Sequence, residues 1–154
     1  MDYEIVTLQE KTVMGVTART NNSAPDMGSV IGGLWEAFYQ KGFYEKIPAG
    51  KKDRVLGIYS DYEGDETADY NMTVACEITP ESVEQGIPEG MTVKRIPAGR
   101  YAKFVVKGHV QYAVMEFWQQ LWQMDLERAF LADFEEYQDS SVEDAEIHIY
   151  IGLK

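Results

Sequence analysis

The chain has 154 residues, of which 45% are hydrophobic, and its formal net charge is -12. This length supports one domain with a hydrophobic core, and the apolar fraction excludes a disordered chain. The acidic balance argues against a nucleic-acid-binding surface, which needs clustered Lys and Arg, and it favours attraction of cations. We interpret the nearest basic cluster, Lys51-Lys52-Asp53-Arg54, as a solvated loop.

Cys76 is the single cysteine, so an intramolecular disulfide and a zinc site built from thiolates are both excluded. Its apolar flanks indicate a small core residue, with a reactive thiol as the alternative. The N-terminus lacks the features of a signal peptide, and no apolar run reaches the roughly 18 residues that a membrane span needs. We therefore expect a cytoplasmic protein.

The first half of the chain is predicted to hold four strands and one helix. The predicted strands cover residues 3–8, 12–19, 55–61 and 70–78, separated by turn-rich or acidic loops at 9–11, 21–26, 47–50 and 63–66. The helix is indicated by an apolar stripe at the spacing i, i+3, i+4, i+7 and i+8, formed by Ile31, Leu34, Trp35, Phe38 and Tyr39. Gly42 is placed to end it.

The second half repeats this plan. Strands are predicted at 91–96, 99–106, 129–137 and 147–151, and the same stripe spacing recurs at Val114, Phe117, Trp118, Leu121 and Trp122. The two stripes superpose at a shift of about 83 residues, with Trp35 over Trp118. Each half then reads strand, strand, helix, strand, strand, and pairing the halves buries their apolar sheet faces. We expect an α+β fold in one domain, 1–154, built of repeats at about 1–83 and 91–154.

An acid between aromatic residues marks the candidate site, in Ala132-Asp133-Phe134-Glu135-Glu136-Tyr137. If this segment is a strand, Glu135 and Tyr137 share one face, and Phe134 and Glu136 share the other. A carboxylate beside a phenol in an aromatic cavity would bind a lipophilic cation. The alternative is an acidic strand at the surface, and we expect Glu136 to face solvent.

Several segments resemble the effector-binding domain of multidrug-responsive transcription regulators, also called the GyrI-like domain. They are Pro97-Ala98-Gly99-Arg100-Tyr101-Ala102, the helix with Trp118 and Trp122, Asp133-Phe134-Glu135-Glu136-Tyr137 and Ile149-Tyr150-Ile151. Over nearly the whole chain the sequence is similar to the free-standing, integron-associated effector-binding type. That similarity is carried by residues 12–20, 34–35, 58–63, 76–77, 87–91 and 125–129.

The resemblance implies two antiparallel sheet-and-helix modules, related by a pseudo-twofold axis, with a ligand cavity between them. It also implies that Glu135, in the pattern Phe-Glu-x-Tyr, meets the positive charge of a lipophilic organic cation. Regulators of this family carry a helix-turn-helix, whereas this sequence starts directly at a predicted strand. We therefore expect no DNA-binding domain and no direct contact with nucleic acid, and a separate regulator or a homodimer as partner.

The predicted ligand-binding residues are an acid and the aromatic residues expected around it. They are Glu135, Tyr137, Trp122, Trp118, Trp35, Tyr59, Tyr70, Phe104 and Tyr150. Positions on the helix stripes equally fit a plain core, and alternation alone leaves the faces of Tyr59, Tyr70 and Tyr150 open. No cofactor or metal is expected, because His109 and His148 are far apart and the acidic loop lacks a calcium-binding pattern.

Three functions compete on this evidence. The first is a binding module that senses or sequesters amphipathic cations. The second is a hydrolase of strained electrophiles, with Glu135 as general acid or base. The third is a protein that acts on gyrase. The sequence offers no nucleophile–base pair and no phosphate-binding loop, so we expect the binding module and no enzyme.

Overall fold

The computed structural model describes every residue except 49 and 66, and it leaves out the side chains of residues 50–53. Three sequence predictions therefore lie wholly or partly outside the described residues. They concern Ala49 in the predicted turn, Glu66 in the predicted acidic loop, and the side chains of Lys51-Lys52-Asp53 in the basic cluster.

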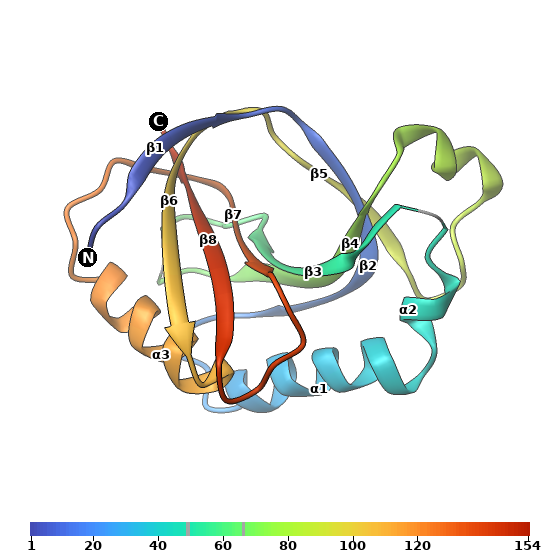
Figure 1. Cartoon of the computed structure of the whole chain (residues 1–154), viewed down its shortest axis with the longest axis horizontal. Helices are drawn as coiled ribbons and strands as arrows, with labels where there is room; N and C mark the ends of the chain where they lie inside the picture. Colours follow the sequence, from blue (N-terminus) through green and yellow to red (C-terminus); the bar gives the residue numbers. More distant parts are fainter. Residues whose placement is uncertain (49, 66) are drawn as a thin grey trace.

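The fold is α+β, as predicted, and the described residues form eight strands and a few helices. Figure 1 shows how these elements are arranged. In chain order the elements are β1 (Glu4–Leu8), β2 (Lys11–Thr20), α1 (Met27–Gln40), α2 (Phe43–Lys46), β3 (Gly50–Ser60), β4 (Tyr70–Ile78), the 3₁₀ helix η1 (Pro80–Gln85), β5 (Thr92–Ile96), β6 (Gly99–Gly108), α3 (Val110–Leu121), β7 (Arg128–Tyr137) and β8 (Ala145–Leu153). The predicted strand bounds agree best with the observed ones at β4, which covers 70–78 in both. The prediction missed α2 and η1, and it began β3 too late, because the backbone is already extended where a basic loop was expected.

All strands join one antiparallel sheet in the order β1-β6-β8-β7-β3-β4-β2-β5. Strands β1 and β2 follow each other in sequence but do not pair. Instead β1 pairs with β6 in the second half, and β5 pairs with β2 in the first half. Figure 1 shows the reason: β1 runs on into β2 as one arch that reaches from one half of the sheet to the other, and β5 runs on into β6 in the same way. The strand order is symmetrical about the β3–β7 pair, which supports the pseudo-twofold; the axis itself stays a prediction.

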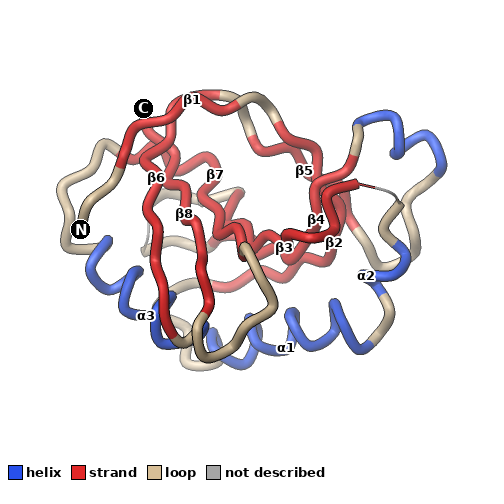
Figure 2. The backbone as a smooth tube through the Cα atoms, in the orientation of Figure 1, coloured by secondary structure: helices blue, strands red, loops and turns tan. Residues whose placement is uncertain are grey.

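The two faces of the sheet carry different cores. Helices α1 and α3 lie on one face (Figure 2), where α1 packs on β2 and β4, and α3 packs on β6 and β8. The buried Cys76 belongs to the first of these cores, as expected. A third core lies on the opposite face, beneath the arches, and includes Phe134, Tyr150 and Tyr101. Period-2 alternation along each strand separates these sets.

Helix α1 is built from a sequence that is weakly helical by itself, since it holds Gly28, Gly32 and Gly33. Its stability therefore comes from packing of the predicted apolar stripe on the sheet. Gly42 follows the helix with a φ of 76°, the left-handed conformation that ends helices. At the start of α3 the ring of His109 accepts a hydrogen bond from the Gln111 backbone N–H, so this histidine serves as a cap.

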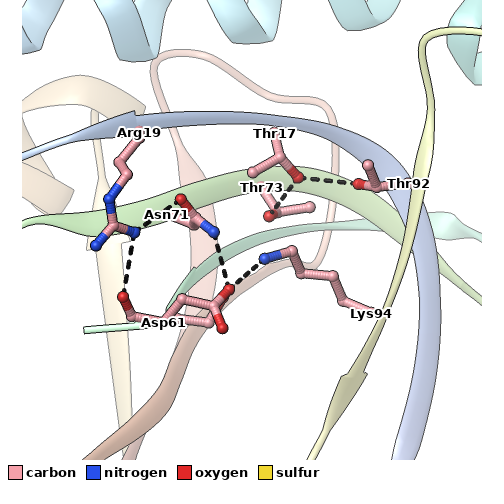
Figure 3. Close-up of polar contacts among 8 residues, drawn as sticks. Thr17, Arg19, Asp61, Asn71, Thr73, Thr92 and Lys94 are labelled. Atoms are coloured by element: carbon pink, nitrogen blue, oxygen red, sulfur yellow. Dashed lines mark hydrogen bonds and ion pairs between the residues drawn. The ribbon is translucent and has the colours of Figure 1, made fainter. Parts of the chain in front are cut away.

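Polar contacts tie the exchanged strand β5 to its neighbours (Figure 3). The Thr17 hydroxyl on β2 lies 2.9 Å from the Thr73 hydroxyl on β4 and 3.0 Å from the Thr92 hydroxyl on β5. Lys94 on β5 donates to the carboxylate of Asp61, just beyond β3. Asp61 thus forms an ion pair with Lys94. The described residues contain no group of three or more acidic, His or Cys side chains placed to hold a metal. In the same described part, no helix is long and apolar enough to cross a membrane.

Candidate functional site

A cavity of about 1290 Å³ lies between the helices and the face of the sheet formed by β3, β4 and β7. The loop 139–142 also lines the cavity. It is tied to the start of α3, where the Val110 backbone N–H donates to the Val142 carbonyl at 2.8 Å. Aromatic side chains dominate the lining: Trp35, Tyr39, Tyr44, Tyr59, Tyr62, Tyr70, Trp118, Trp122 and Tyr137. Such a cavity suits a flat or globular apolar ligand.

Glu135 on β7 is the buried acid of this cavity, with 1% of its surface exposed. Its Oε2 accepts hydrogen bonds from the Tyr59 hydroxyl at 2.8 Å and from the Trp118 indole N–H at 2.7 Å. Its Oε1 accepts one from the Tyr137 hydroxyl at 2.7 Å, so Glu135 and Tyr137 do share a face. Three elements, β3, α3 and β7, therefore meet at one carboxylate.

The donors around Glu135 are all neutral. Burial raises the pKa of Glu135 above its usual value of 4.5, and the hydrogen bonds from Tyr137, Trp118 and Tyr59 oppose that rise. Burial, followed by the charge of Glu135, raises the pKa of both Tyr59 and Tyr137 well above the ordinary value of a phenol. Among the described residues no Lys, Arg or His forms an ion pair with Glu135. Its charge, when ionised, is thus hydrogen-bonded but not neutralised.

Asp133 provides an internal contrast, because it lies two residues earlier on the same face of β7. It is fully buried, and its Oδ2 accepts from Arg128 Nη2 at 2.7 Å and from the Tyr62 hydroxyl at 2.6 Å. Its Oδ1 accepts from the Gly152 backbone N–H at 2.8 Å. Asp133 therefore has a resident cation, whereas the described part of the chain gives Glu135 none.

Gly57 on β3 makes room for this carboxylate. It is the cross-strand partner of Glu135, and a Cβ added to it would lie 3.1 Å from Glu135 Oε1, 3.1 Å from Met72 Cε and 3.3 Å from Trp35 Cζ2. A side chain at this position would press on the acid and on the ring beside it at the same time.

We expect Gly57→Ala to reduce the affinity for a cationic ligand about fivefold to tenfold, at a cost of roughly 1–2 kcal/mol in the free energy of unfolding. The measurements are a tryptophan-quenching titration and urea denaturation. Gly33→Ala is the matched control, because a Cβ there meets nothing within 4 Å. If Gly57→Ala binds as tightly as the wild-type protein, the carboxylate is not held in a close-fitting position.

Most of the predicted ligand-binding residues line the cavity: Glu135, Tyr137, Trp122, Trp118, Trp35, Tyr59 and Tyr70. The ring of Trp35 meets that of Tyr137 edge-on at 5.1 Å between centroids, and Tyr59 meets Trp118 at 4.9 Å. Trp122, 40% exposed at the end of α3, is the most open of the predicted aromatic residues in this lining.

Two predicted residues lie elsewhere. Tyr150 is paired opposite Phe134 across β7 and β8, and therefore follows it to the other face, where the rings stack at 4.6 Å. Phe104 is on the helix face but packs beneath α3 against Phe117 at 5.0 Å, away from the cavity lining. Glu136, expected in solvent, is partly buried, and its Oε1 accepts from Gln138 Nε2 at 2.8 Å.

The cavity is also lined by Arg128, Tyr62 and the loop 139–142, which were not predicted from the sequence. The register of β7 against β8 is irregular between Arg128 and Asp133, and Phe130 there has a φ of 54°. A bulge of this kind breaks the period-2 pattern, so alternation along the strand did not place Arg128 beside Asp133. Tyr62 gave only a weak signal in the sequence, because Asp61-Tyr62-Glu63 in the first half has the same pattern as Asp133-Phe134-Glu135 in the second.

The model of the family Cass2, described as integron-associated effector binding protein, matches residues 4–153. The chain belongs to this family. A search of the curated proteins gave no match.

Solved structures agree with the family assignment. The integron cassette protein VCH_CASS2 from the mobile metagenome of Vibrio cholerae is 25% identical, with a TM-score of 0.70, covering 97% of this chain and 95% of that one. A putative transcription regulation protein from Staphylococcus aureus MU50 is 22% identical, with a TM-score of 0.76, covering 100% and 99%. The protein SAV2435, solved with bound tetraphenylphosphonium, is 20% identical, with a TM-score of 0.75, covering 100% and 94%. The last two structures show that these proteins share the fold of this chain.

Proposed function

We propose that this effector-binding protein binds lipophilic organic cations in its aromatic cavity, with Glu135 as the counter-ion, and acts as a stand-alone sensor or sequestering module. One observation carries the proposal: among the described residues, Glu135 is buried with neutral donors and without a cation, while Asp133 on the same face is paired with Arg128. The fold neutralises one buried acid and leaves the other for a ligand.

The energetics favour a cation over a neutral ligand. Burying an unpaired charge is costly, so a ligand charge that enters the cavity needs an opposite charge there. Glu135 supplies it. The aromatic rings that surround the carboxylate add about 0.5–2 kcal/mol for each good cation–π contact in a desolvated site. The tetraphenylphosphonium bound to SAV2435, a protein of the same fold, is a cation of this kind and therefore a suitable probe.

Ligand affinity should depend on pH through Glu135. Burial raises the pKa of Glu135 in the empty cavity, and a bound cation favours the ionised form and lowers it again. Ionising an acid of raised pKa costs stability, so the stability of the empty protein falls as pH rises from the usual Glu value of 4.5 through the raised value. Binding of a permanent cation reverses that loss.

We therefore expect the affinity for tetraphenylphosphonium to increase with pH between the lowered pKa of Glu135 in the complex and its raised pKa in the empty protein, and to level off above the latter. The slope should approach tenfold per pH unit within this window, because binding releases one proton. Calorimetric titration at a series of pH values measures it. Glu135→Gln removes the titrating group and should flatten the profile; a wild-type profile that is already flat would remove Glu135 as the charge partner.

Binding without conversion distinguishes this proposal from hydrolysis. A positioned general acid or base would consume a strained electrophile such as an aryl epoxide with repeated turnover. We expect each probe to be recovered unchanged after prolonged incubation with the protein, as judged by mass spectrometry. Product that accumulates beyond one equivalent, and that is lost in Glu135→Gln, would favour the hydrolase instead.

A further inference from the structure

Arg128 is the first residue of β7 and lies in the cavity lining, although its side chain is 8% exposed. Its Nη2 donates to Asp133 at 2.7 Å. Its Nε is buried and has no hydrogen-bond partner among the described residues. A guanidinium carries N–H donors at all three nitrogens, and buried donors are almost always satisfied in folded proteins. The unmatched N–H of Arg128 therefore calls for an acceptor.

The described residues around Arg128 do not supply one. The guanidinium carbon lies 4.3 Å from the centre of the Phe130 ring and 6.0 Å from that of Trp118. The carboxylate of Asp133 already accepts from Tyr62 and from the Gly152 backbone as well as from Arg128. Arg128 lines the cavity and donates one hydrogen bond among the described residues, so an oxygen atom of a ligand there can accept from its remaining N–H groups.

The Arg128–Asp133 pair carries no net charge, so its positive end does not exclude a cation from the rest of the cavity. Trp118 connects the two polar points: its indole N–H donates to Glu135, and its ring faces the guanidinium of Arg128. One fused aromatic ligand can therefore reach both the unpaired acid and the unmatched donor.

We propose that Arg128 forms a second polar subsite, which binds an acceptor oxygen on the ligand whose positive charge faces Glu135. The effector class is thus an aromatic cation that also bears an ester, carbonyl or carboxylate oxygen. This inference rests on the proposed function, and it adds a preference among cations that charge alone does not give. Planar Arg N–H groups suit such an oxygen better than the single ammonium of Lys.

The test uses two dyes that are both cations and differ in one group. Tetramethylrosamine carries a plain phenyl ring on its xanthylium core, and tetramethylrhodamine methyl ester carries the same ring with an ester. We expect the wild-type protein to bind the ester about tenfold more tightly, the value of one hydrogen bond to a charged donor. In Arg128→Lys this preference should fall to about twofold or less. Fluorescence anisotropy measures both dissociation constants.

A second variant covers the risk that Arg128→Lys fails to fold. The pair replaced together, Arg128→Met with Asp133→Leu, removes both charges at once and leaves no buried ion unpaired. It too should lose the preference for the ester. If the wild-type protein shows no preference, or if the preference survives in both variants, Arg128 is only a structural partner of Asp133 and the subsite is refuted.

Glu135→Gln separates this inference from the proposed function. It should weaken both dyes by a similar factor and leave their ratio near the wild-type value, because the ester does not face Glu135. If Glu135→Gln weakens the binding of tetramethylrosamine but the substitutions of Arg128 leave the preference for the ester unchanged, the subsite is refuted and the proposed function stands. If tetramethylrosamine does not bind, or binds equally to the wild-type and Glu135→Gln proteins, the proposed function fails and the subsite with it.

Discussion

Glu135→Gln should weaken the binding of tetraphenylphosphonium by about a hundredfold, or roughly 2–4 kcal/mol, because it removes the only charge partner that the cavity interior offers among the described residues. The amide is close in shape to the carboxylate. Its oxygen still accepts from Tyr59 and Trp118, and the Tyr137 hydroxyl accepts from the amide N–H instead. The loss then reports charge and not collapse of the site. Isothermal titration calorimetry measures it.

Two controls make this result specific. Tetraphenylborate has nearly the size and shape of tetraphenylphosphonium but the opposite charge, so its binding should be weak in the wild-type protein and improve in Glu135→Gln. Glu136→Gln changes the neighbouring acid, which lies on the other face of β7 and outside the cavity lining, and should leave both ligands within about twofold. If Glu135→Gln weakens the cation and the anion equally, the carboxylate holds the cavity in shape without acting as a counter-ion.

Asp133→Ala should lower the free energy of unfolding by about 3–5 kcal/mol, which is a large part of the stability of a domain of this size. The substitution leaves the buried guanidinium of Arg128 without its counter-ion, and it leaves the Tyr62 hydroxyl and the Gly152 N–H without an acceptor. A buried charge without a partner is among the most costly defects that a single substitution makes. Urea denaturation followed by tryptophan fluorescence measures the loss.

The double replacement Arg128→Met with Asp133→Leu should recover part of that loss, because it leaves no buried charge unpaired, although the Tyr62 hydroxyl and the Gly152 N–H still lack an acceptor. Asp139→Ala is the surface control, since this acid is exposed at the edge of the cavity, and it should cost no more than about 0.5 kcal/mol. An Asp133→Ala protein as stable as the wild type would show that the ion pair is not formed in solution. The contrast between the two buried acids would then lose its basis.

Local patterns were sufficient to predict the elements that position the acid. Period 2 along β7 placed Glu135 and Tyr137 together, and the helical stripes placed Trp35 and Trp118 on the inner faces of α1 and α3. Each of these predictions needs only the geometry of one element. The class of fold followed from the order of the elements, and antiparallel pairing was implied by the family resemblance; both are confirmed.

Pairing between distant strands was beyond the reach of such patterns. Alternation alone left the face of Tyr150 open, and it is the register opposite Phe134 that places this ring in the other core. The exchange of β1 and β5 between the halves is equally hidden, because a strand looks the same whichever neighbour it pairs with. Arg128 was missed because regular alternation places it on the opposite face from Asp133, five residues later, whereas the bulge between them brings the two side chains together.

The titration of Glu135 itself is the most direct test of whether its negative charge awaits a ligand. Carbon-13 NMR of the side-chain carboxyl, with and without saturating tetraphenylphosphonium, follows that single group, and Glu135→Gln identifies its signal. We predict a pKa above the usual 4.5 in the empty protein and a clear fall when the cation binds. A carboxyl that titrates at its usual pKa and does not respond to the cation would contradict the account.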